Sequence, residues 1–192
     1  MKKQILLLAA LTITSVCSYA QTNYDNFNGG PRIGKITMKS GVSNLKSIKV
    51  ANPKKDKINS SDSCGAYVRS PTTDYDFVKI NTGKLVDVTP YVEGNKKITM
   101  LFWSPTAGTN VEIFLQDAVA AEAPFPKGRH SMYRATTSEE NKWELLTFEF
   151  VFQADETVPA TNISQLLIQV APNSKDGSTY YFDDLTGPNP VK

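Results

Sequence analysis

Short segments in which apolar and polar residues alternate follow one another along most of the chain. The clearest is residues 143–153, WELLTFEFVFQ, whose even-numbered residues from Leu146 to Phe152 are all apolar and predict one buried face. Its odd-numbered residues from Thr147 to Val151 fall on the opposite face. Further segments with strand-like patterns are 46–52, 76–82, 96–105, 110–117, 163–172 and 179–185.

Turn signals separate these segments, and helix signals are weak. Sequences such as EGN (93–95), AGTN (107–110) and KDGS (175–178) lie between the strand-like runs. Residues 115–125 could hold a turn or two of helix and are interpreted mainly as a loop. Many short strands at regular spacing predict an all-β fold, a β-sandwich or jelly roll, although periodicity does not give the strand order.

The N-terminal twenty residues have the pattern of an export signal. Lys2 and Lys3 form a short basic region, residues 5–16 form an apolar core, and SYA precedes Gln21 as a small-x-small cleavage site. The apolar run is shorter than the roughly 20 residues that cross a bilayer, so no membrane span is expected. We therefore predict a cleaved signal peptide at residues 1–20 and a periplasmic, cell-surface or secreted protein.

Removal of this segment changes both the charge and the cysteine count. The full chain has 21 Lys and Arg against 19 Asp and Glu, and loss of Lys2 and Lys3 leaves 19 against 19. A neutral protein gives no reason to expect nucleic-acid binding. Cys64 is then the one remaining cysteine, which excludes an intrachain disulfide. Cys17 leaves a lipoprotein signal open as an alternative, and residues 21–192 are expected to form a single domain.

No pattern of catalytic residues stands out. His130 is the sole histidine, which excludes His-rich metal sites, and no serine lies in a G-x-S-x-G sequence. Glycoside hydrolysis needs two carboxylic acids that flank one bond. Nothing in the sequence selects such a pair from Glu112, Asp117, Glu144 and Glu149. The chain is therefore not expected to be an enzyme.

Several motifs in order resemble a known class of module. They are NYDNFNGG (23–30), VANPKKDKINSSDSCGAYVRS (50–70), the run from 85 to 117, NKWELLTFEF (141–150) and TYYFDDL (179–185). This order resembles the secreted jelly-roll modules of the galactose-binding-like fold, many of which are carbohydrate-binding modules attached to bacterial glycoside hydrolases. The sequences NPxxxxxNxS and WELLTFxF look most like modules from glycan-degrading Bacteroidetes.

The resemblance implies a non-catalytic, exported protein that binds a poly- or oligosaccharide on one face of the β-sandwich. The alternative is a structural or adhesive jelly-roll protein of the cell envelope that binds a protein partner and no sugar. A hydrolase or lyase on the same scaffold is a third, weaker interpretation. The module is expected to stand without an attached catalytic domain, and fold alone does not determine function.

Sugar sites combine aromatic surface with a few oriented polar groups. Trp103 is the first candidate, because alternation places Ile98, Met100 and Phe102 on one face and Trp103 on the other. Trp103 either contributes to a binding surface or packs under a loop. Trp143 is more typical of a structural residue.

The segment FPKGRHSMYR, residues 125–134, looks like a loop that could edge a binding face with its aromatic and basic side chains. Gln116 and Gln169, late in their strands, could supply amide hydrogen bonds. The candidate ligand-binding residues are Trp103, Gln116, Phe125, Arg129, His130, Tyr133, Arg134 and Gln169.

Two adjacent aspartates, Asp183 and Asp184, follow aromatic residues in the last strand-like segment. Strand alternation sends them to opposite faces, one of them on the face of Tyr181 and Leu185. Related modules carry a structural calcium ion, so the resemblance implies a calcium site formed by Asp25 with Asp183 or Asp184. A carboxylate that accepts backbone N–H bonds instead of binding a metal is the alternative.

Overall fold

The computed structural model describes residues 21–28, 35–38 and 49–192, with only the backbone described for 35–38. Within these ranges the chain is almost entirely β, which confirms the predicted fold class. The predicted export signal at 1–20, the Cys17 alternative and the beginning of the predicted strand 46–52 lie outside the described residues.

Each of the seven predicted strand segments contains a strand, whereas four further strands and the helix at Thr89–Val92 were not predicted. One of the four, Arg129–Thr136, shows that the prediction of a loop over residues 125–134 is wrong from Arg129 onward. Two strands lie near the N-terminus and nine follow: β1 (Thr22–Asn23), β2 (Lys35–Met38), β3 (Lys49–Ala51), β4 (Ser63–Val68), β5 (Phe77–Asn81), β6 (Ile98–Ser104), β7 (Asn110–Gln116), β8 (Arg129–Thr136), β9 (Lys142–Gln153), β10 (Gln165–Val170) and β11 (Thr179–Gly187). The helices are α1 (Thr89–Val92) and the 3₁₀ helix η1 (Ala120–Glu122), which lies in the segment interpreted as mainly loop. None of the described helices is long and apolar enough to span a membrane.

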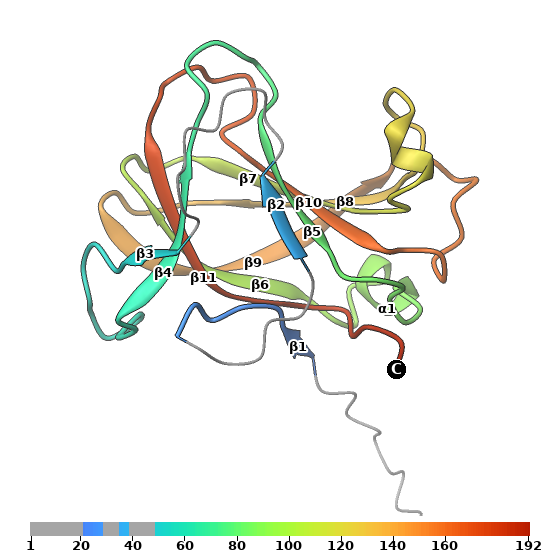
Figure 1. Cartoon of the computed structure of the whole chain (residues 1–192), viewed down its shortest axis with the longest axis horizontal. Helices are drawn as coiled ribbons and strands as arrows, with labels where there is room; N and C mark the ends of the chain where they lie inside the picture. The colour runs from blue at the N-terminus through green and yellow to red at the C-terminus, as the bar shows by residue number, and fades with distance from the viewer. Residues whose placement is uncertain (1–20, 29–34, 39–48) are drawn as a thin grey trace, which may run out of the picture.

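The strands form two antiparallel layers (Figure 1). Sheet B has the order β2-β5-β10-β7-β8-β9, and sheet A continues as β9-β6-β11-β4-β3, with β1 on β11. The long strand β9 belongs to both sheets, because Lys142–Phe148 pair with β6 and Glu149–Gln153 pair with β8.

The hydrophobic core fills the space between the two sheets. In β6, Ile98, Met100 and Phe102 point into the core, as the alternation predicts. Inward residues of β7 and β10, such as Ile113 and Ile168, meet them from sheet B. Burial of each such side chain stabilises the fold by about 1.5–3 kcal/mol. The outer faces of the two sheets are therefore the surfaces left for ligands.

A β-bulge in β9 changes which way Phe152 points. Tyr133 pairs with Phe150 and Met132 pairs with Phe152, so Val151 is the extra residue. The bulge turns Phe152 onto the outer face of sheet B, where its side chain is 38% exposed. The prediction that Phe152 shares the buried face of Leu146 is therefore wrong at this residue.

A second irregularity lies at the two aspartates of β11. The pairing with β6 shifts between Asp183 and Thr186, and Asp184 has a positive φ of 46°. Leu185 consequently joins the core, whereas Asp183 pairs with Leu101 of β6. The predicted shared face of Tyr181 and Leu185 is wrong, because strict alternation stops at Asp184.

A candidate ligand-binding pocket on the outer face of sheet B

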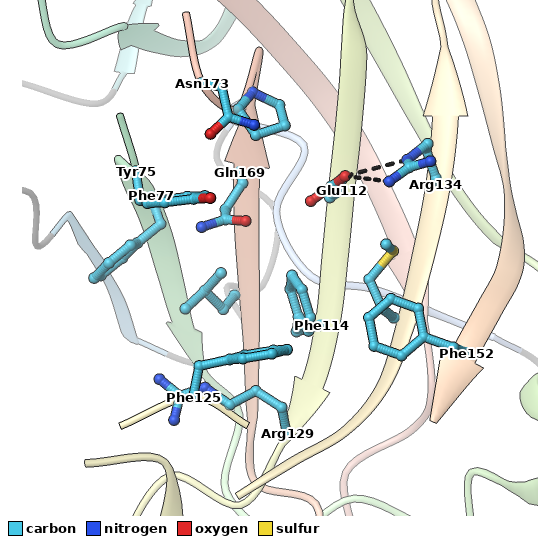
Figure 2. Close-up of a pocket in the computed structure, with 13 residues that line it drawn as sticks. Tyr75, Phe77, Glu112, Phe114, Phe125, Arg129, Arg134, Phe152, Gln169 and Asn173 are labelled. Atoms are coloured by element: carbon cyan, nitrogen blue, oxygen red, sulfur yellow. Dashed lines mark hydrogen bonds and ion pairs between the residues drawn. The ribbon is translucent and has the colours of Figure 1, made fainter. Parts of the chain in front are cut away.

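An open pocket of about 520 Å³ lies on the outer face of sheet B. It crosses strands β5, β10, β7, β8 and β9 and is bordered by the loops around residues 75, 125 and 173. Figure 2 shows the side chains that line it. Because these strands are held by the core on their other side, the pocket stands on a rigid support.

The floor of the pocket is apolar. The strand register aligns Leu167, Phe114, Met132 and Phe152 across β10, β7, β8 and β9. The first three are buried although they lie outside the main core, because they pack against one another and against Phe77. The floor is therefore a small second hydrophobic cluster with one side open to the pocket.

Exposed aromatic rings border the pocket above this floor. Phe125 is 61% exposed and lies edge-to-face over Phe114, with ring centroids 6.4 Å apart and planes at 83°. Tyr75 is also exposed and lies at the other end of the pocket, near Asn173 (Figure 2). Exposed rings held by neighbouring side chains provide apolar surface with little loss of conformational freedom on binding.

Polar groups occupy one end of the pocket. Arg134 donates from Nε and Nη2 to Oε1 of Glu112, at 3.1 and 2.7 Å. Gln169 lies next to Glu112 on the adjoining strand, since the two residues pair in the register of β10 and β7. Asn173 borders the same end. This end therefore offers carboxylate, amide and guanidinium groups beside an aromatic floor.

A buried arginine holds the loops at this polar end. Arg69 is completely buried, and its guanidinium donates to the backbone carbonyls of Asp74, Ala171 and Ser174. Its Nη1 lies 3.8 Å from Asp76, which is itself buried. Arg69 thus joins the loop that carries Tyr75 to the loop that carries Asn173.

The opposite end of the pocket is formed by the loop between β7 and β8. Arg129 donates from Nη1 to the carbonyls of Ala123 and Lys127, at 2.8 and 2.6 Å. Gly128 has a φ of 77°, and a Cβ there would lie 2.2 Å from the backbone N of Ala121. The loop is therefore closely packed on η1, which fixes the positions of Phe125 and Arg129.

The structure brings together four of the residues predicted from the sequence. They are Phe125, Arg129, Arg134 and Gln169, and all of them line the pocket. Gln116 lies on the same sheet but is fully buried, where its Nε2 donates to Gln165 and Gln165 donates in turn to Asn81. Gln116 therefore links β7 to β10 through side-chain hydrogen bonds and does not line the pocket.

Three other predicted residues lie elsewhere. Tyr133 points into the main core, and His130 is buried with Nδ1 3.0 Å from the hydroxyl of Ser131, so neither lines the pocket. Burial lowers the pKa of His130 below its ordinary value. Trp103 lies on the outer face of sheet A, edge-to-face with Tyr181 at 5.2 Å.

The prediction that Trp103 shares a site with residues 125–134 is therefore corrected. Trp103 packs with the strand residues Leu101, Trp143 and Cys64 on the far side of the sandwich. Alternation in β6 was enough to place it outside the core, but not to say which of two outer faces it would occupy.

Several pocket residues were not predicted from the sequence. They include Tyr75, Phe77, Glu112, Phe114 and Phe152. Segment 110–117 carries one signal of this pocket in its sequence. Phe114 points outward but is apolar, although the inward residues of the strand already supply the core. A strand that is apolar on both faces indicates that something covers or uses its second face.

The residues predicted to hold calcium make other contacts. Asp183 is fully buried, with Oδ2 accepting from Asn59 Nδ2 at 3.1 Å and Oδ1 accepting from the backbone N of Asp184 at 2.9 Å. Asp184 accepts from Asn23 Nδ2 at 2.7 Å. In the described part of the chain, no three acidic, His or Cys side chains come together as metal ligands. Calcium binding by these residues stays an untested prediction.

The pH dependence of stability distinguishes the two interpretations of Asp183. Burial raises the pKa of this carboxyl to about 6, although the hydrogen bond from Asn59 opposes the rise. An unfolded aspartate has a pKa near 3.9, so the folded chain holds this proton more tightly. The free energy of unfolding contributed by Asp183 should then fall by up to about 3 kcal/mol between pH 4 and pH 6 and level off above.

Urea unfolding of wild type and Asp183→Asn across this pH range measures the effect. The difference in unfolding free energy between the two should shift in favour of Asp183→Asn as the pH rises. A calcium ligand would instead have a lowered pKa, and the difference would change with pH in the opposite direction. Glu140→Gln, at an exposed carboxylate, is the control for the general effect of losing one charge.

The fold is similar to that of carbohydrate-binding modules of known structure. A family 30 module is 12% identical, with a TM-score of 0.59, and the match covers 86% of this chain and 97% of that module. A family 11 module from Clostridium thermocellum, in complex with a β-1,3-1,4-mixed-linked tetrasaccharide, is 13% identical, with a TM-score of 0.52 and coverages of 89% and 96%. At these identities the likeness shows the fold alone.

Part of one enzyme also has this fold. An arabinose-bound α-L-arabinofuranosidase is 15% identical, with a TM-score of 0.56, and the match covers 88% of this chain but 26% of the enzyme. No protein-family model and no curated protein sequence matches the chain. The predicted resemblance to jelly-roll carbohydrate-binding modules is confirmed at the level of the fold, whereas its Bacteroidetes character remains a prediction.

Proposed function

We propose that the protein is a non-catalytic, exported carbohydrate-binding protein whose ligand lies in the pocket on sheet B. The observation that carries the proposal is the composition of that pocket. Exposed aromatic rings and a buried apolar floor meet a small group of polar side chains in one open depression. The export signal predicted at residues 1–20 supports the proposed location outside the cytoplasm.

The aromatic and the polar parts of the pocket match the C–H faces and the hydroxyl groups of a sugar. One face of a pyranose presents mainly C–H groups, and Phe125, Phe114 and Phe152 offer rings for such a face. The rim of a sugar presents hydroxyl groups, which can donate to Glu112 and exchange hydrogen bonds with the Gln169 amide. Specificity would then come from the polar end and most of the affinity from the aromatic end.

The pocket is not equipped for glycoside hydrolysis. Among the described residues that line it, Glu112 is the one carboxylic acid. It accepts hydrogen bonds from Nε and Nη2 of Arg134. Hydrolysis by the common mechanism needs a second carboxylic acid across the scissile bond. This supports binding without catalysis.

The alternative of a protein partner has less support from the shape of this surface. Protein interfaces are commonly broad and flat, whereas the rings here border a hollow that suits a chain-like or small ligand. The family 11 module with a bound tetrasaccharide adds support through its similar fold. The protein-partner alternative would be favoured if the chain binds no polysaccharide and a partner protein buries Phe125.

Phe125→Ala tests the proposed function. Loss of one stacking ring should weaken binding to a retained polysaccharide about tenfold, since such contacts are worth roughly 0.5–1.5 kcal/mol beyond their buried area. The melting temperature should hardly change, because Phe125 is 61% exposed. Affinity electrophoresis in gels that contain soluble polysaccharides measures the retention.

Val119→Ala is the matched control for this experiment. Val119 is 79% exposed in the same loop and does not line the pocket, so its loss should leave retention unchanged. Equal retention of wild type and Phe125→Ala would argue against the pocket as the site. Failure of the wild type to be retained by any polysaccharide would refute the proposed function itself.

A further inference from the structure

We propose that the pocket selects an anionic glycan, and that Arg129 binds a carboxylate carried by the sugar. The inference rests on the proposed function and specifies its substrate class. It begins with a difference between the two arginines that line the pocket, Arg129 and Arg134.

Arg134 is already neutralised. Its Nε and Nη2 both donate to one oxygen of Glu112, Oε1, and hydrogen bonds between charged groups are stronger than those between neutral groups. The Glu112 side chain is only 11% exposed, so its charge and that of Arg134 largely cancel within the pocket. This end suits neutral, hydroxyl-bearing sugar units.

Arg129 is held in place without being neutralised. Both of its hydrogen bonds go from Nη1 to backbone carbonyls, those of Ala123 and Lys127, and the described part of the chain gives it no carboxylate within ion-pair distance. Nε and Nη2, the pair that Arg134 uses for Glu112, are thus left for a ligand. A guanidinium fixed in advance loses less conformational freedom when it binds an anion.

The surroundings of Arg129 strengthen its attraction for an anion. Burial lowers the pKa of its guanidinium from the ordinary value, which reflects the partial loss of water around the charge. Figure 2 shows Arg129 beneath Phe125, at the end of the pocket away from Asn173. Charges in such partly dehydrated positions interact more strongly than charges in bulk water.

The positions of the charges also give the ligand a direction. Arg129 pairs in register with Gln116 of β7, and Glu112 lies four residues earlier on the same strand. At about 3.3 Å per residue, the two positions are separated by roughly 13 Å along the strand. Arg134 is already paired with Glu112 and leaves no free cation there for an anion, so the sugar carboxylate should lie at Arg129 and neutral hydroxyl groups at Glu112.

Polymers that share a backbone and differ in charge test the inference. Suitable pairs are polygalacturonate with its methyl-esterified form, and carboxymethylcellulose with hydroxyethylcellulose. The wild type should be retained more strongly by the acidic member of at least one pair, and 0.5 M NaCl should reduce that difference because salt screens the charge. Arg129→Gln should weaken acidic-polymer binding at least about tenfold and leave neutral-polymer binding nearly unchanged.

Two further variants separate charge from shape. Arg129→Lys keeps the charge and should retain part of the preference, whereas Lys127→Gln removes a cation from the same loop outside the pocket and should change nothing. Equal retention by the two members of every pair, or an equal loss for both in Arg129→Gln, would overturn the inference and leave the proposed function standing. Absence of retention by every polymer would instead refute the proposed function.

Discussion

Replacement of Arg69 by methionine is expected to lower the free energy of unfolding by about 3–5 kcal/mol. Arg69 is completely buried, and the variant would leave the Asp76 carboxylate buried without its cation. It would also strip hydrogen-bond donors from the carbonyls of Asp74, Ala171 and Ser174. For a chain of this length, such a loss lowers the melting temperature by about 6–20 °C.

Lys142→Met is the control for Arg69→Met. Lys142 forms an exposed ion pair with Glu139, and breaking such a pair costs at most about 1 kcal/mol. Urea unfolding gives both values, and the double variant Arg69→Met with Asp76→Asn should recover part of the loss. A loss in Arg69→Met no larger than in Lys142→Met would contradict the assigned role of Arg69.

Substitution of Gly128 by alanine is expected to displace the loop that carries Phe125 and Arg129. The new Cβ would lie 2.2 Å from the backbone N of Ala121, a contact that no side-chain rotation relieves. The added crowding and the positive φ should together cost about 2–4 kcal/mol, measured by urea unfolding. Polysaccharide retention should fall with it, because η1 and the loop must separate.

Gly108→Ala separates backbone strain from steric conflict. Gly108 has a similar φ of 75°, but a Cβ there meets no atom within 4 Å. This variant should therefore lose only the roughly 1–2 kcal/mol that a left-handed alanine costs, and it should be retained by polysaccharide as the wild type is. Equal effects of the two substitutions would show that the contact with η1 does not position the loop.

Strand alternation predicted the fold class and most of the buried positions. Ile98, Met100 and Phe102 fill the core as the sequence indicates. The errors in side-chain direction arise at irregularities in β9 and β11, since one extra residue reverses every later side chain in a strand. Alternation also missed β8, because its first residues lie in a segment that looks like a loop. Phe152 was assigned to the buried face, yet the bulge at Val151 turns it into the pocket.

The candidate site depended on information that local pattern does not contain. Residues 125–134 were a useful prediction because Phe125, Arg129 and Arg134 do line the pocket. His130 does not line the pocket, because its side chain is buried. Trp103 was placed correctly outside the core, but sheet membership decides which outer face a strand presents, and sheet membership is a long-range property.

The position of the ligand is the central claim, and an NMR titration tests it most directly. Backbone and side-chain amide signals would be followed while an oligosaccharide of a retained polymer is added. The signals of the Gln169 and Asn173 side chains and of the backbone amides of Phe125 and Arg129 should shift, because these residues line the pocket. The indole N–H signals of Trp103 and Trp143, the chain's two tryptophans, should stay in place, because both lie on the outer face of sheet A. Shifts confined to these indoles and to Tyr181, with the pocket signals unchanged, would contradict the account.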